Sequence, residues 1–234
     1  VFVAAFERFG VEAGMDDARA PMGLPKRDHI AAMLARPALA RQWEARHGHA
    51  PDKADIDKVY EVFVPMNEEV VADYATLVPG TVETVQALRA QGTKIGSTTG
   101  YTRSIMERIL PAAAAQGYAP DNLVCADDLA EGRPGPLCMY QCFIDLVAYP
   151  PERVVKVDDT APGIAEGVAA GCVTVGVALS GNLVGRTPQE LAALPGAEID
   201  ALRETAGTAL RAAGADHVID TVADLPVLLE RIAP

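Results

Sequence analysis

The chain has 234 residues, 50% of them hydrophobic, which is enough to bury the core of one domain or of one domain with a smaller insert. Its formal net charge of -12 repels nucleic acids and anionic membranes, which argues against a general polyanion binder. No apolar run approaches the roughly 18 residues of a membrane span and the four cysteines are irregularly spaced, so we expect a cytoplasmic protein with reduced thiols.

The first part of the chain has helical patterns and contains no convincing strand. These patterns occur in PKRDHIAAMLA, ALARQWEARHG and ADIDKVYEVFVPMNEEVVADYATL. The segment LVPG interrupts them near Ala75 to Gly80. We therefore predict a helical domain over residues 1–74 and a second domain over residues 75–234.

From Thr81 onward, apolar runs typical of strands alternate with helical patterns. The predicted strands are Thr93–Thr98, Asn122–Ala126, Val154–Val157, Cys172–Ala178 and His217–Ile219. The predicted helices are Val82–Arg89, Arg103–Ala115, Leu137–Ala148 and Ala161–Ala170. The alternation predicts an α/β fold in which helices cover both faces of a parallel sheet.

Ligands of open α/β sheets bind beyond the carboxyl ends of the strands, so the residues that follow each apolar run are the first to consider. After KIGST come Thr99, Gly100 and Tyr101, and then a helix that begins near Arg103. Hydroxyl groups and a glycine amide at a helix N-terminus can bind phosphoryl oxygens. An ordinary threonine cap followed by a glycine turn is the alternative.

Arg133 lies in the loop DDLAEGRPGP, between Gly132 and Pro134, after another apolar run. A guanidinium in a stiff loop at the mouth of the sheet could neutralise charge during phosphoryl transfer. A solvated surface arginine is the alternative, because most arginines are exposed.

Two adjacent acids, Asp158 and Asp159, follow the run VVKV and precede a helix. Neighbouring carboxylates at the end of a buried strand repel each other unless a cation or hydrogen-bond donors offset their charge, and Mg²⁺ is the natural cation. The alternative is a helix-capping acid beside a solvated one.

Taken together, GSTTGYT, EGRPGP and VKVDDTAPGIAEG resemble, in order and spacing, the second, third and fourth motifs of haloacid dehalogenase phosphotransferases. APMGLPKRDHI resembles the cap-domain signature of the phosphonoacetaldehyde hydrolase family, also called phosphonatases. With RQWE and GADHVIDTVADL, the resemblance extends over nearly the whole chain. It implies a Rossmann-like core with a parallel sheet, a small all-helical cap, Mg²⁺, a homodimer and cleavage of the carbon–phosphorus bond of phosphonoacetaldehyde.

The resemblance also implies roles for residues of the cap and of the core. In the cap, Lys26 has the position of the family's Schiff-base lysine, and Met22 and His29 match its neighbours. In the core, the matching residues are the phosphoryl-binding Thr99, Tyr101 at the cap interface, the motif-three cation Arg133 and the magnesium ligand Asp159.

Two departures from the family pattern affect the site. One family pattern has a further acid where this chain has Gly163, so Asp158 is expected to take over part of that role. The family's opening strand, which ends in the nucleophilic aspartate, has no counterpart before Val1. We therefore expect the sequence to start inside the cap of a longer protein.

The chemistry explains why a lysine is needed. Cleavage of a carbon–phosphorus bond expels a carbanion, and an imine formed between Lys26 and the aldehyde can accept those electrons. The amine must be neutral to attack, although its ordinary pKa is about 10.4. Pro25 fits the first position of a helix, so Lys26 is expected near the positive end of the helix dipole, with His29 on the same face.

Several alternatives remain open. Without the resemblance, Lys26 would be interpreted as a solvated helix residue. A general phosphatase or phosphomutase of the superfamily would give Lys26 no covalent role, and an inactive homologue could bind phosphonate without turnover. For Cys138 and Cys142, packed thiols are favoured over a metal site, as is a solvated turn for the two histidines that flank Gly48.

Overall fold

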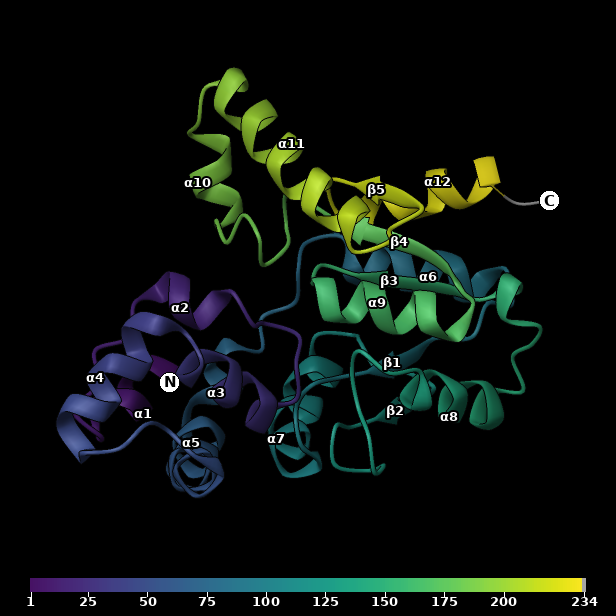
Figure 1. Cartoon of the computed structure of the whole chain (residues 1–234). Coiled ribbons are helices and arrows are strands. Elements are labelled where there is room, and N and C mark those ends of the chain that lie inside the picture. Colours follow the sequence, from purple (N-terminus) through teal and green to yellow (C-terminus); the bar gives the residue numbers. More distant parts are fainter. Residues whose placement is uncertain (233–234) are drawn as a thin grey trace.

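The computed structural model describes residues 1–232. Its first part contains five α-helices and one 3₁₀ helix, and no strand occurs within residues 1–74, as predicted. They are α1 (Phe2–Glu7), α2 (Met15–Arg19), α3 (Lys26–Leu34), α4 (Pro37–His47), α5 (Lys53–Val70) and η1 (Val71–Tyr74). Figure 1 shows helices α1 to α5 gathered beside the strands.

These helices pack around a hydrophobic cluster of their own. Phe6, Trp43 and Phe63 are almost wholly buried in it, and they come from α1, α4 and α5. Burial of such large side chains contributes on the order of 1.5–3 kcal/mol each, which can hold short helices together. The division into domains 1–74 and 75–234 stays a prediction.

The strands of the described residues are parallel and form two sheets. One sheet pairs β1 (Gly96–Thr98) with β2 (Asn122–Val124), and the other has the order β3 (Val155–Asp158), β4 (Val173–Val177) and β5 (His217–Ile219). Thr98 lies opposite Val124, and Asp158 lies opposite Gly176. The predicted α/β class with parallel strands is confirmed.

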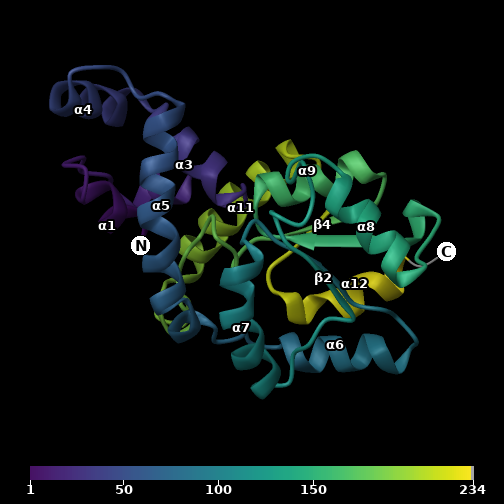
Figure 2. The same cartoon turned by 90° about the horizontal axis from the view of Figure 1, so that it is seen from below.

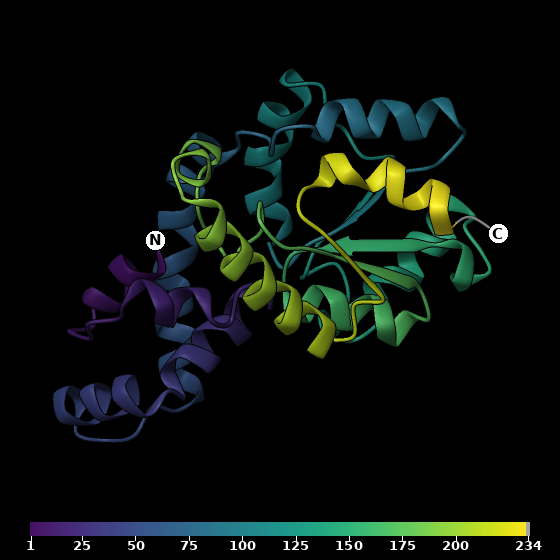
Figure 3. The same ribbon diagram turned by 90° about the horizontal axis from the view of Figure 1, so that it is seen from above.

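Helices cover both faces of the strands, as Figures 2 and 3 show. α6 (Thr81–Ala90) and α12 (Leu225–Ile232) pack on one face, where Leu88 and Leu228 contact the β4 and β5 side chains. α9 (Ala161–Ala170) and α11 (Gly196–Ala212) pack on the other, through Ile164 and Leu210. The remaining elements are α7 (Arg103–Ala115), α8 (Leu137–Leu146), η2 (Pro151–Arg153), α10 (Pro188–Ala192) and η3 (Val222–Asp224).

The start of β1 and the end of β2 differ from the prediction because a side chain and a loop take the backbone hydrogen bonds. The amide of Ile95 donates to the Asp121 carboxylate (2.7 Å), and β1 starts only at Gly96. The amide of Ala126 donates to Tyr101 O (3.0 Å), beyond the end of β2. The bounds of α7, α9 and β5 match the predicted ones.

Polar side chains connect the two sheets at one end. β1 and β3 belong to different sheets, and Lys156 Nζ on β3 donates to Thr98 Oγ1 on β1 (2.7 Å). The carboxyl ends of both strands, at Thr98 and Asp158, therefore lie near each other. Among residues 1–232, no helix combines the length and the apolar character that crossing a membrane requires.

Candidate active site

Lys26 is the first residue of α3, and Pro25 is the residue that caps this helix rather than its first position. The side chain is only 6% exposed, and Nζ lies 4.2 Å from the centroid of the Tyr101 ring. The aromatic face favours the ammonium form, whereas burial disfavours it. Burial, followed by the positive charge of Arg133, lowers the pKa of Lys26 to about 8. The amine is therefore much easier to deprotonate than an ordinary lysine.

His29 lies one helical turn after Lys26 and is fully buried. Its Nε2–H donates to Ala18 O (2.9 Å), and its ring stacks on Phe2 with centroids 3.8 Å apart. Burial, with the nearby charge of Lys26, lowers the pKa of His29 to about 4. The ring is neutral at pH 7, and Nδ1 keeps its lone pair without a partner among the described residues. Nδ1 can therefore accept a hydrogen bond near Lys26.

The loop that leads into α3 lies close against the core. A Cβ at Gly100 would lie 2.6 Å from Leu24 O, and a Cβ at Gly132 would lie 3.2 Å from Pro25 Cγ. A Cβ at Gly23 would overlap the Thr160 side chain. Met22 is half-buried in this loop. This close contact brings the start of α3 onto the residues that follow β1 and β3.

Gly100→Ala should lower kcat/KM by about 10- to 100-fold, because the added methyl group would push the loop before Lys26 away from the core. Gly196→Ala is the matched control, since a Cβ there meets no other atom within 4 Å. Steady-state kinetics of both variants checks this. Equal activity of the two variants would show that this close approach is not needed for catalysis.

The segment after β1 forms a turn ahead of α7. Thr99 Oγ1 accepts a hydrogen bond from the Tyr101 amide (3.1 Å), while Thr102 caps α7 by accepting from the Ile105 amide. The ordinary helix cap is thus Thr102. Because Thr99 Oγ1 is the acceptor in its hydrogen bond with the Tyr101 amide, its O–H group can still donate to a ligand. Burial raises the pKa of the Tyr101 hydroxyl.

Arg133 is the centre of a buried ionic cluster. Its side chain is only 8% exposed. Nη2 donates to Thr98 O (2.8 Å) and lies 3.1 Å from Asp158 Oδ2. Nε donates to Glu166 Oε2 (3.1 Å). Lys156 Nζ also donates to Glu166 Oε2 (2.7 Å). The alternative of a solvated arginine is therefore wrong.

The two adjacent acids behave differently. Asp158 Oδ1 accepts from the Thr160 hydroxyl (2.7 Å), and although burial opposes its ionisation, the charges of Arg133 and Lys156 lower its pKa. Asp159 accepts from the Asn182 amide (2.7 Å), and burial and the charge of Asp158 raise its pKa. The negative charge of Asp159 is thus less well balanced than that of Asp158, and a bound cation would stabilise it more.

A cavity of about 250 Å³ lies beside these acids, with Asp158, Asp159 and Ser180 among the residues that line it. The Ser180 hydroxyl is buried without a hydrogen-bond partner among the described residues. Two carboxylates and a hydroxyl are the oxygen ligands that Mg²⁺ prefers, so the residues fit a divalent cation. A Cβ at Gly163 would overlap the Asp158 carboxylate, so this carboxylate occupies the space that a side chain at position 163 would need.

Three residues of the buried ionic cluster, Thr98, Lys156 and Glu166, are not predicted from the sequence. A signal was present for two of them, because Lys156 interrupts an apolar strand and Glu166 lies on the buried face of a helix rich in alanine and glycine. Charged residues are rarely buried unless they are paired. Their pairing depends on how α9 lies across the strands, which no local pattern reveals.

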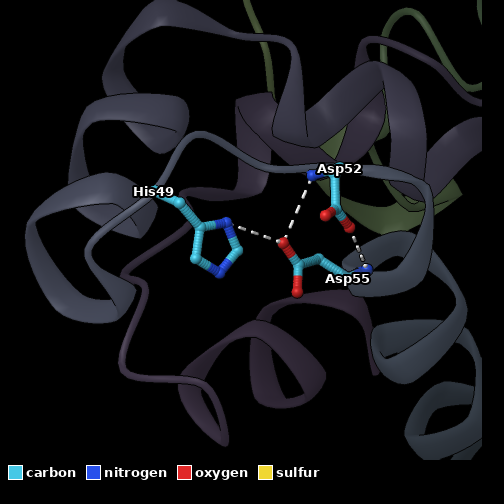
Figure 4. A group of neighbouring side chains, drawn as sticks. All are labelled: His49, Asp52 and Asp55. Atoms are coloured by element: carbon cyan, nitrogen blue, oxygen red, sulfur yellow. Dashed lines mark hydrogen bonds and ion pairs between the residues drawn. The ribbon is translucent and has the colours of Figure 1, made fainter.

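Another group of metal-ligating residue types lies together in the helical part of the chain, namely His49, Asp52 and Asp55 (Figure 4). Asp52 and Asp55 form the capping box that starts α5, and each carboxylate accepts the other residue's amide. Lys58 Nζ already lies 3.0 Å from Asp55 Oδ1. The group is therefore explained as a helix start with a bound lysine.

The cysteines are buried and unreactive. Cys138 and Cys142 pack with Val124 in a hydrophobic cluster, as expected for packed thiols. Burial raises the pKa of Cys125 and of Cys138 to about 11. Neither thiol is a nucleophile at neutral pH.

A family model of haloacid dehalogenase-like hydrolases matches residues 1–171. The phosphonoacetaldehyde hydrolase of Paraburkholderia phytofirmans is 49% identical over 98% of this chain and 86% of the relative. That of Klebsiella pneumoniae is 49% identical over 99% of this chain and 87% of the relative. A crystal structure of a phosphonoacetaldehyde hydrolase-like protein from Oleispira antarctica is 40% identical, with a TM-score of 0.95 over 98% of this chain and 83% of that one.

Proposed function

Because this chain belongs to the phosphonoacetaldehyde hydrolase family of the haloacid dehalogenase-like hydrolases, we propose that it cleaves the carbon–phosphorus bond of phosphonoacetaldehyde, giving acetaldehyde and phosphate. The observation that carries the proposal is the buried amine of Lys26, whose pKa is lowered to about 8 beside the Arg133 cluster. A phosphatase that acts on esters has no use for such an amine, because its leaving group is an alcohol.

In the proposed reaction, the neutral amine of Lys26 adds to the aldehyde, and the resulting carbinolamine loses water to form an iminium. When the carbon–phosphorus bond breaks, the phosphoryl group passes to an acceptor from which water later releases phosphate, and the electron pair of the bond moves into the iminium and produces an enamine. Protonation and hydrolysis of the enamine then release acetaldehyde and restore the amine. His29 supports this sequence, because its neutral ring leaves Nδ1 free to accept a hydrogen bond next to Lys26.

The other end of the substrate carries the phosphoryl group. In the proposal, Arg133 neutralises its oxygens, the Thr99 hydroxyl and the Gly100 amide donate hydrogen bonds to it, and Tyr101 and Met22 line the aldehyde side. Asp159, with Asp158, would hold Mg²⁺, which supplies charge neutralisation for the transferred group. The resemblance assigns the phosphoryl acceptor to an aspartate without a counterpart among residues 1–234, so we propose no residue of this sequence for that role.

The pH dependence of catalysis follows from Lys26. With a pKa of about 8 the amine is about one tenth neutral at pH 7 and about nine tenths neutral at pH 9. We expect kcat/KM to rise about tenfold over that interval and then to level off. An ordinary lysine would give a rise that continues beyond pH 10, and such a profile in a buffer series would contradict the role of burial.

The proposed activity is tested by incubating the full-length protein, including the aspartate that would accept the phosphoryl group, with Mg²⁺ and phosphonoacetaldehyde and measuring both products. We expect acetaldehyde and phosphate in equal amounts, and little phosphate from a simple phosphate monoester under the same conditions. Faster release from the monoester than from the phosphonate would favour a general phosphatase and contradict the proposal.

A further inference from the structure

Glu166, on α9, is a wholly buried acid that none of the roles above uses. Its Oε2 accepts hydrogen bonds from the Thr98 hydroxyl (2.6 Å), Lys156 Nζ (2.7 Å) and Arg133 Nε (3.1 Å). One oxygen atom thus connects β1, β3 and the loop that carries Arg133.

The start of α9 and its apolar packing do not depend on Glu166. The N-terminus of α9 is capped by Thr160, and the helix packs on the core through apolar residues such as Ile164. Removal of a carboxylate from water is costly, and a buried ionic cluster is often no more stable than apolar side chains of the same volume. The role of Glu166 therefore concerns the side chains that donate hydrogen bonds to it, above all Arg133.

Glu166 restricts the guanidinium of Arg133. Nε is directed to Glu166 and Nη2 to Thr98 and Asp158, whereas Nη1 has no hydrogen-bond partner within residues 1–232. A planar guanidinium that is fixed on two sides directs its remaining donor in one direction. That donor is available for an anion.

The packing of α9 makes the arrangement rigid. A Cβ at Gly167, the residue next to Glu166, would lie only 2.6 Å from Lys156 Cγ. The helix backbone therefore lies directly on the Lys156 side chain, which has little room to move. Glu166 and Asp158 together balance the charges of Lys156 and Arg133.

We propose that Glu166 is a positioning residue, which holds the Arg133 guanidinium so that its free Nη1 faces the phosphoryl oxygens. The inference rests on the proposed function, because it assumes that Arg133 binds the phosphoryl group. It also explains why Lys156 lies in the middle of an apolar strand: its ammonium balances the second acid of the cluster.

The test is a double-mutant cycle of Glu166→Gln and Arg133→Lys in the whole protein, with inorganic phosphate as the ligand. By titration calorimetry, Glu166→Gln alone should weaken phosphate binding about tenfold and lower kcat/KM by about 10- to 100-fold. In the Arg133→Lys background, which already lacks the Nε contact, it should add less than about threefold. If Glu166 had a purely structural role, Glu166→Gln would instead weaken phosphate binding by the same factor in the Arg133→Lys background as in the wild type.

Two further variants complete the experiment. Glu230→Gln, at an exposed acid of α12, is the control for loss of a charge and should bind phosphate like the wild type. Glu166→Asp keeps the buried charge but retracts the carboxylate by one carbon–carbon bond, so it should also weaken phosphate binding even if Glu166→Gln fails to fold. Wild-type affinity in Glu166→Asp, or full additivity in the cycle, would overturn the inference. Failure of the wild type to cleave phosphonoacetaldehyde would refute the proposed function, while the phosphate affinities would still report on Glu166.

Discussion

Replacement of Lys26 by arginine should reduce kcat by about 10⁴-fold or more. A guanidinium keeps the positive charge and can still lie against the Tyr101 ring, but it cannot be deprotonated in a protein and forms no imine. The loss should appear in kcat, because the proposed phosphoryl contacts of Arg133 and Thr99 would remain.

Lys58→Arg is the matched control for this change. Lys58 is exposed and forms an ion pair with Asp55 that arginine can keep, so its kcat should equal that of the wild type. Stopped assays of phosphate release measure both variants. If Lys26→Arg kept a tenth or more of the wild-type kcat, the amine would have no covalent role.

The second large effect is expected for Asp159→Asn. The side-chain oxygen of the new asparagine can still accept the hydrogen bond from the backbone N–H of Asn182, so the local fold should persist. The negative charge that would hold Mg²⁺ is lost. We expect Mg²⁺ affinity to fall by about 100-fold and kcat by about 10³-fold at a fixed, low Mg²⁺ concentration.

Titration calorimetry with Mg²⁺ alone separates metal binding from turnover in this variant. Asp73→Asn, at an exposed acid of η1, is the control and should bind Mg²⁺ with wild-type affinity. Unchanged affinity in Asp159→Asn would remove Asp159 from the set of metal ligands and direct attention to other acids.

Much of the α/β architecture could be predicted because its strands are short apolar runs that alternate with amphipathic helices. The bounds of α7 and α9 follow from clear start signals, the caps Thr102 and Thr160. No helix is predicted between Ala178 and His217, where the structure has α10 and α11. The capping box formed by Thr187 and Glu190 was the signal for α10.

For the candidate site as well, some features could be predicted from the sequence and others could not. Arg133 and Asp158 could be proposed from the sequence because they follow apolar runs, and ligands gather at the carboxyl ends of strands. The burial of Lys26 could not be deduced from local pattern, because a lysine at a helix start is ordinarily solvated. It depends on Gly100 and Gly132, which let the loop before α3 approach the core closely.

Borohydride trapping tests the covalent role of Lys26 most directly. The protein is incubated with phosphonoacetaldehyde, reduced with borohydride, digested and examined by mass spectrometry. We predict irreversible inactivation and a reduced two-carbon adduct on the peptide that contains Lys26, absent without the aldehyde and absent in Lys26→Arg. Full activity after reduction, with Lys26 unmodified in an enzyme that still releases acetaldehyde, would contradict the account.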